Sequence, residues 1–175
     1  LASGRLISGP QGDSVLPALI AATGSGMAGG LDDLLGATNT KGLRGHLKAL
    51  LRGDVTTGSL KIAAIGASGL AAAVVVANDR VATKTGWLQM PVDGAFSAGS
   101  ANLMNLFDLR PGRALKVAML AAGVSSLTTR QVALEAAAVS GTAASLLPDD
   151  LAERAMLGDT GANALGAVLA VGAVR

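Results

Sequence analysis

Long apolar runs separated by short polar segments dominate the pattern of this chain. The runs cover residues 15–31, 60–77, 87–107, 114–127, 131–147 and 162–174. At about 1.5 Å of rise per residue, segments of this length suit helices that cross or nearly cross a bilayer. The pattern therefore predicts an all-α fold, a polytopic membrane helix bundle with about six spans in this chain.

The composition supports a membrane protein over a soluble one. Half of the 175 residues are hydrophobic, only 15% are charged, 24 are glycine, and the mean hydropathy is +0.51. Such a chain has little polar surface to cover a globule, whereas abundant small residues suit closely packed membrane helices. Cysteine is missing, which excludes disulfides, thiolate catalysis and zinc–thiolate sites. We expect one transmembrane domain over residues 1–175, an interior piece of a longer protein.

A different pattern occupies residues 40–54, between the first two runs. Leucines recur there at helical spacing, and basic residues fall on another face, namely Lys41, Arg44, Lys48 and Arg52. This predicts an amphipathic helix in the membrane interface, with its cations facing lipid phosphates or an anionic substrate. A solvated face on an ordinary helix is the alternative.

Six crossings place alternate connections on the same side of the membrane. The segments after the first, third and fifth runs then share one side, and that side holds most of the Lys and Arg residues. Cytoplasmic loops carry this excess of positive charge. We expect a multi-pass protein of the plasma membrane whose acidic and glycine-rich motifs face the cytoplasm.

The first of these motifs is the acidic pair Asp32-Asp33, which follows an apolar run that has no charge. At the polar rim of a bilayer, adjacent carboxylates can bind a divalent cation or handle protons without the full desolvation cost of the hydrocarbon core. The alternative is that the pair only caps a following helix. For Asp149 and Asp150, after Pro148, we expect such a capping role at a helix start.

Two more motifs fall on the same predicted side. Asn102, Asn105 and Asp108 recur every three residues and so line one face of a helix. The loop that follows supplies three cations suited to phosphate oxygens: Arg110, Arg113 and Lys116. The third motif, Gly158-Asp159-Thr160-Gly161-Ala162-Asn163, sets a carboxylate between glycines at a helix start, where a metal-bound phosphate can approach closely.

The order of these motifs, over residues 30–166, resembles the polyprenyl-phosphate N-acetylhexosamine-1-phosphate transferase superfamily. The resemblance implies a membrane protein of ten helices. It implies transfer of a sugar-1-phosphate from a UDP-N-acetyl sugar to a polyprenyl phosphate lipid, with release of UMP and a requirement for Mg²⁺. Such a reaction serves the synthesis of cell-envelope glycopolymers. Nucleic acid is not an expected partner, and a homodimer stays open.

Carried over to this sequence, the resemblance implies catalytic roles for Asp32, Asp33 and Asp108, and a metal-binding role for Asp159. It implies a substrate-binding set of amides and cations, which comprises Asn102, Asn105, Lys41, Lys48, Arg110, Arg113 and Lys116. Two polyanions must be brought together in this chemistry, so a metal and a basic collar would offset their charge.

Two positions and one missing loop depart from the family pattern. Pro111 stands where the middle motif has a second acid, and Gly36 stands where a basic residue often follows the acidic pair. The family's histidine-containing loop has no counterpart, because the single histidine, His46, lies in the segment of residues 40–54. We expect His46 to be an interfacial polar residue.

Two rival functions remain. Residues 61–70 mimic a strand that runs into a glycine turn, as in soluble nucleotide-binding proteins, although the full glycine spacing is missing. Small residues at a helix contact explain Gly66 and Gly69 better. The second rival is a non-catalytic membrane protein that binds prenyl phosphate, or a transporter fragment that uses Asp93 and Glu135.

Overall fold

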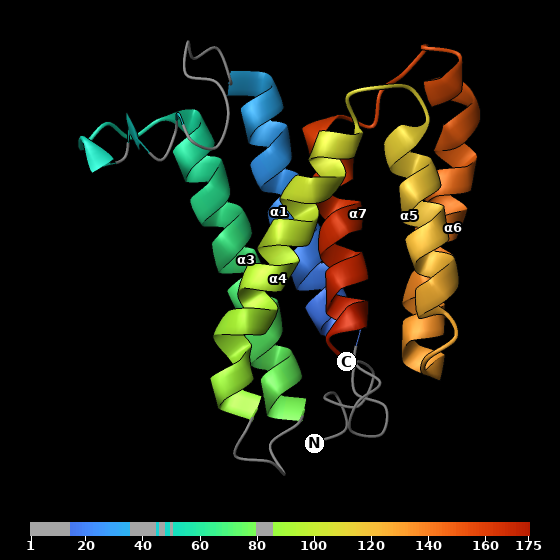
Figure 1. The fold of residues 1–175 in the computed structure, drawn as a ribbon, viewed down its shortest axis with the longest axis horizontal. Coiled ribbons are helices and arrows are strands. Elements are labelled where there is room, and N and C mark those ends of the chain that lie inside the picture. The colour runs from blue at the N-terminus through green and yellow to red at the C-terminus, as the bar shows by residue number, and fades with distance from the viewer. Residues whose placement is uncertain (1–14, 36–44, 46–47, 50, 80–85) are drawn as a thin grey trace, which may run out of the picture.

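The computed structural model describes residues 15–35, 45, 48–49, 51–79 and 86–175. These residues form α-helices joined by short connections and contain no strand. The helices are α1 (Leu16–Leu35), α3 (Thr57–Asp79), α4 (Gly86–Phe107), α5 (Arg113–Ser125), α6 (Arg130–Leu151) and α7 (Gly158–Ala173) (Figure 1). The all-α prediction is confirmed for the described chain, and each of the six apolar runs lies largely within a helix. The interpretation of residues 61–70 as a strand that runs into a glycine turn is wrong, because α3 runs straight through them.

Successive helices run in opposite directions, so every second connection lies at the same end of the molecule. Figure 1 shows α1, α3, α4 and α7 packed side by side, with α5 and α6 paired against α7. The C-terminal ends of α1 and α4 therefore meet the N-terminal ends of α3 and α7 at the upper end in this view. All three sequence motifs belong to that end.

Alanine and glycine fill the interior of the bundle. Most of the fully buried side chains are alanines, for example Ala21, Ala101, Ala114, Ala118, Ala162 and Ala167. At Gly29 an added Cβ would overlap the carbonyl oxygen of Asp159, and at Gly166 it would overlap that of Ser100. The backbone of α7 thus approaches α1 and α4 more closely than any larger residue would allow.

Glycine plays the same part where α3 crosses α4. An added Cβ at Gly69 would lie 2.7 Å from the carbonyl oxygen of Gly94, whereas Gly66 has nothing within 4 Å. The prediction of small residues at a helix contact is therefore confirmed for Gly69 and wrong for Gly66. Gly66 lies one turn away from the crossing, where a Cβ would contact none of the described residues.

Most leucines of the described helices are exposed on the outside of the bundle, whereas Leu115 and Leu165 are buried. Large exposed apolar side chains from every described helix except α7 include Leu19, Met27, Leu70, Phe96, Leu103, Leu120, Val124 and Leu134. Within the described residues, one helix meets the length and hydropathy of a membrane span, over Thr57–Ala77 with a mean hydropathy of 2.0. The bundle of six spans stays a prediction.

One predicted helix boundary is wrong. Asp149 and Asp150 do not start a helix, because α6 continues through Pro148 and ends at Leu151. Pro148 lies near the end of α6, where its ring is accommodated, and Glu153 then leaves the helical conformation with φ of 56°. The two acids therefore stand at a helix C-terminus, where their carboxylates need partners from elsewhere.

Several predictions fall on residues outside the described ranges. They are most of the amphipathic segment over residues 40–54, with Lys41, Arg44 and His46, and the departure from the family pattern at Gly36. Lys48 and Arg52, at the edge of that segment, are exposed.

Candidate functional site

The acidic pair lies in the last turn of α1, which is an unfavourable place for negative charge. A helix C-terminus carries partial negative charge and exposed carbonyl groups, so Asp32 and Asp33 are destabilised there by their own helix. The alternative that the pair caps the start of a following helix is therefore wrong in this structure. The two carboxylates are stabilised instead by groups on α3 and α7.

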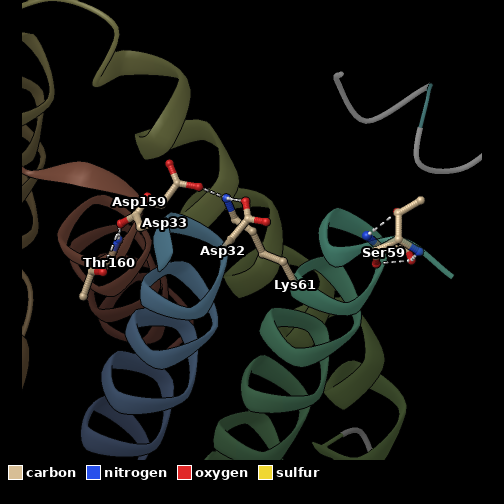
Figure 2. A network of polar contacts seen from close by, with 7 residues as sticks. Asp32, Asp33, Ser59, Lys61, Asp159 and Thr160 are labelled. Carbon is tan, nitrogen blue, oxygen red and sulfur yellow. Dashed lines mark hydrogen bonds and ion pairs between the residues drawn. The ribbon is translucent and has the colours of Figure 1, made fainter. Parts of the chain in front are cut away.

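Asp32 is paired with Lys61 of α3. The Lys61 Nζ lies 3.2 Å from Asp32 Oδ2 and also contacts Asp159 Oδ2, so one ammonium bridges acids from α1 and α7. Figure 2 shows Lys61 reaching between these two carboxylates. The Lys61 side chain is 10% exposed. A cation held at this depth needs both anionic partners, because desolvation of the ammonium is costly.

Asp33 binds the first turn of α7. Its Oδ2 accepts hydrogen bonds from the backbone N–H of Thr160 at 3.3 Å and from Thr160 Oγ1 at 3.2 Å (Figure 2). The residue before α7, Leu157, has no side chain that could cap the helix. A carboxylate from α1 thus satisfies donors that α7 leaves free and interacts favourably with the positive end of its dipole.

Asp108 also caps the start of α7, because its Oδ2 accepts a hydrogen bond from the backbone N–H of Gly158 at 2.8 Å. Gly158 has φ of 66°, a left-handed conformation that favours glycine. Asp108 follows the end of α4 and is 7% exposed. The amino end of α7 is therefore held by carboxylates from the ends of both α1 and α4.

A second carboxylate, that of Asp150, links the α6–α7 connection back to the α4–α5 connection. Asp150, at the end of α6, accepts the backbone N–H of Gly112 at 2.5 Å, and Gly112 has φ of 72°. Burial raises the pKa of the Asp108 carboxyl above its usual value, and the negative charges of Asp150 and Asp33 add to this rise, while the bond from Gly158 opposes it. The buried carboxylates of Asp108 and Asp150 therefore hold together the connections that precede α5 and α7.

The remaining predicted site residues are less closely engaged. Arg110 and Lys116 are exposed, Asn102 and Asn105 are partly buried, and the buried Nε of Arg113 has no hydrogen-bond partner among the described residues. In the part of the chain described, none of these side chains forms a hydrogen bond or ion pair with the carboxylates of the predicted site, which are Asp32, Asp33, Asp108 and Asp159. Arg110, Arg113 and Lys116 thus lie at the same end of the bundle as the acids without being joined to them.

Sequence reasoning missed the cation that does contact the acids. Lys61 is the sole charge between residues 60 and 77, and an ionisable residue inside an apolar run is a functional candidate by default. That signal was present in the sequence. Thr160 lay within a predicted motif without a role, and the link from Asp150 to Gly112 has no signal in the local sequence.

The site is flanked by apolar surface. A cavity of about 270 Å³ opens between α1 and α3, lined by Asp32 and Lys61 at one end and by Ala28, Leu31, Leu60 and Ala64 along its walls. The surface that lines this cavity is almost wholly apolar. Such a lining suits a hydrocarbon chain.

The donor set has the chemistry of a magnesium site without its assembled geometry. Asp32, Asp33, Asp108 and Asp159 supply hard oxygen ligands, and their charge exceeds that of the single ammonium among them. Within the described ranges, no group of three acidic or histidine side chains is close enough together to hold a metal ion. Lys61 instead takes the position of a cation between Asp32 and Asp159, so the positive charge beside these two acids is the ammonium of Lys61.

Comparison of the chain with protein-family models, curated proteins and solved structures gave no match.

Replacing Lys61 by Met tests the bridge. The variant keeps the length of the side chain but leaves Asp32 and Asp159 without their counter-charge, so we expect a loss of about 2 kcal/mol in the free energy of unfolding, between the values for exposed and buried pairs. Lys116→Met, on the exposed face of α5, is the matched control and should change stability little. Equal stability of both variants in denaturant titrations would contradict the bridge.

Replacing Asp108 by Asn tests the buried carboxyl. The folded pKa of Asp108 lies above its unfolded value, so its contribution is most favourable at low pH and is lost as pH rises through the folded pKa. Asn still accepts the N–H of Gly158 but carries no charge beside Asp150 and Asp33. We expect the difference in melting temperature, Asp108→Asn minus wild type, to become more positive as pH increases from about pH 4. A difference in melting temperature that is constant over pH would count against this account.

Proposed function

We propose that this protein transfers a sugar-1-phosphate from a UDP-N-acetyl sugar to polyprenyl phosphate at the cytoplasmic membrane face, with release of UMP. The observation that supports it most is the meeting of the three motifs. Carboxylates from the ends of α1 and α4 bind the amino end of α7, next to Asp159. The motifs are far apart in sequence, and their resemblance to the transferase superfamily requires a common site.

The distribution of side-chain sizes supports the membrane part of the proposal. A soluble helical protein buries most of its large apolar residues, whereas here most of the buried hydrophobic residues are alanines and most of the described leucines are exposed. In lipid, burial of large apolar side chains gives no advantage, and close contact between small residues holds helices together. Exposed apolar surface of this extent also marks contact with lipid or protein.

In the proposed reaction, an oxygen of polyprenyl phosphate attacks the β-phosphorus of the UDP-sugar. A new phosphorus–oxygen bond forms, the bond from that phosphorus to the bridging oxygen breaks, and UMP leaves. Asp33 is the exposed member of the acidic pair and would accept the proton of the lipid phosphate. Asp108 is buried and would position the first turn of α7 through its bond to Gly158.

The cations of the chain have separate parts in this proposal. Lys61, once released from the acids, and Arg113, whose Nε is free of partners among the described residues, would meet phosphate oxygens. Mg²⁺, bound by Asp159 and Asp32, would supply neutralisation of the diphosphate and of the leaving UMP. The apolar wall between α1 and α3 would contact the start of the prenyl chain.

A non-catalytic role is the second candidate, and the Lys61 bridge favours it. An ammonium between Asp32 and Asp159 neutralises the acids without any metal, as in a structural polar core. Pro111 also replaces the second acid of the middle motif. A protein of this kind would bind prenyl phosphate at the same end of the bundle without turnover.

A turnover assay decides between the two. The full-length protein in detergent is supplied with Mg²⁺, polyprenyl phosphate and each of a panel of UDP-N-acetyl sugars, and UMP release is followed. We expect metal-dependent UMP formation that falls by at least about a hundredfold in Asp159→Asn, because the variant loses an anionic metal ligand.

The matched control is Asp149→Asn, which removes an exposed acid paired with Arg154 at the same end of the bundle. It should retain the wild-type rate. If a folded wild type that binds polyprenyl phosphate releases no UMP from any donor, the transferase proposal is wrong and the non-catalytic role replaces it.

A further inference from the structure

A second apolar cavity, of about 220 Å³, lies between α4, α5 and α7. Its lining runs from Phe96 to Phe107 on α4, from Val117 to Ser125 on α5 and from Gly166 to Ala173 on α7. At 1.5 Å of rise per residue, the part on α4 is about 16 Å long. The cavity is therefore an elongated groove that follows three helices, and nearly all of its surface is apolar.

Small side chains on two of the three walls produce this groove. Ala121 and Ser125 of α5 and Gly166 and Ala170 of α7 leave space that their side chains do not fill. An apolar cavity stays dry, and when it is empty its walls lose dispersion contacts. An apolar cavity of about 150 Å³ already holds a benzene ring, so this groove has room for a segment of hydrocarbon chain.

The groove is accessible from the outside of the bundle along α4. Phe96 and Leu103, which line it, are 49% and 52% exposed. A chain from surrounding lipid can therefore enter sideways, without passing through the bundle. The hydrocarbon core of a bilayer is about 30 Å thick, so one leaflet is about 15 Å deep. The length of the groove thus matches an acyl chain that ends near the middle of the bilayer.

The connection between α4 and α5 closes the upper end of the groove, because residues 107 and 117 on either side of it both line the cavity (Figure 1). Arg110 and Lys116 of this connection are exposed. The carboxylates of Asp108 and Asp150 at the same place are buried, and each accepts a backbone N–H. The exposed charge at this end of the groove is therefore positive, which suits the phosphate of a lipid headgroup.

We propose that this groove binds an anionic glycerophospholipid of the bilayer, with one acyl chain between α4, α5 and α7 and the phosphate at Arg110 and Lys116. The site shares no lining residue with the cavity between α1 and α3. The lipid fills the space between α5 and the two helices opposite, and so stabilises their packing. This inference rests on the membrane part of the proposed function and is independent of the transfer reaction.

Phospholipid binding by the full-length protein in detergent tests the proposal without substrates. Native mass spectrometry measures the affinities for phosphatidylglycerol and for phosphatidylcholine with the same acyl chains. In Ala121→Leu the larger side chain occupies the groove and displaces at least two methylene groups of the lipid. We therefore expect the affinity for phosphatidylglycerol to fall by about tenfold or more. The same variant without lipid should melt at a higher temperature, because its cavity is partly filled.

The headgroup is tested by Arg110→Gln and Lys116→Gln. Each variant removes one cation beside the phosphate, so we expect affinity for phosphatidylglycerol to fall by about fivefold in each, with affinity for phosphatidylcholine unchanged. Ala138→Leu is the matched control for the groove, since it makes the same change on the exposed face of α6. It should leave both affinities at the wild-type value.

The proposal is overturned if the wild type binds no phospholipid, if it binds both phospholipids equally, or if Ala121→Leu binds phosphatidylglycerol as the wild type does. It is also wrong if polyprenyl phosphate, and not phosphatidylglycerol, depends on Ala121. Should Ala121→Leu fail to fold, Ser125→Leu on the same wall replaces it. A protein that binds phosphatidylglycerol in this groove and releases no UMP would support the inference and contradict the proposed transferase.

Discussion

The structure depends on how the first turn of α7 is capped. This helix begins without a capping side chain of its own, and carboxylates from the ends of α1 and α4 bind its free N–H groups. The contact joins two unfavourable features, since acids at the C-terminus of α1 and free donors at the N-terminus of α7 each cost free energy alone. When the carboxylates accept the N–H groups of α7, the three sequence motifs are held together. The ammonium of Lys61 then neutralises part of the negative charge of Asp32 and Asp159.

Close helix packing makes this contact geometrically possible. Gly29 lets α1 approach the backbone of α7 at Asp159, and Gly166 does the same for α4, so the carboxylates are near enough to reach the helix start. Most of the described leucines lie on the outside, which leaves an apolar surface around a core rich in alanine. The same choice of residues thus supports both the polar site and the proposed membrane environment.

Sequence reasoning predicted the helices and the common end of the motifs because both follow from simple periodicity. Six apolar runs of alternating direction place residues 32–33, 108 and 159 at one end, whichever solvent surrounds them. The partners of those acids depend on the rotation of each helix about its axis, which small, uniformly apolar residues specify weakly. The bridge from Lys61, the bond from Asp150 to Gly112 and the burial of Asn163 therefore appear only in three dimensions. The continuation of α6 through Pro148 was missed because a proline followed by acids is typical of helix starts.

A disulfide cross-link tests the meeting of α1 and α7 most directly. A Cβ at Gly30 would lie 4.0 Å from the Cβ of Thr160, within the separation of about 3.5–4.5 Å that a disulfide spans, and the chain has no cysteine of its own. The account predicts that Gly30→Cys with Thr160→Cys forms an intramolecular disulfide in the membrane-extracted protein under mild oxidation. Gly30→Cys with Gly141→Cys, on an open face of α6, should form none. Absence of the cross-link in the first pair, or equal cross-linking in both, would contradict the convergence of the motifs on which the proposed function rests.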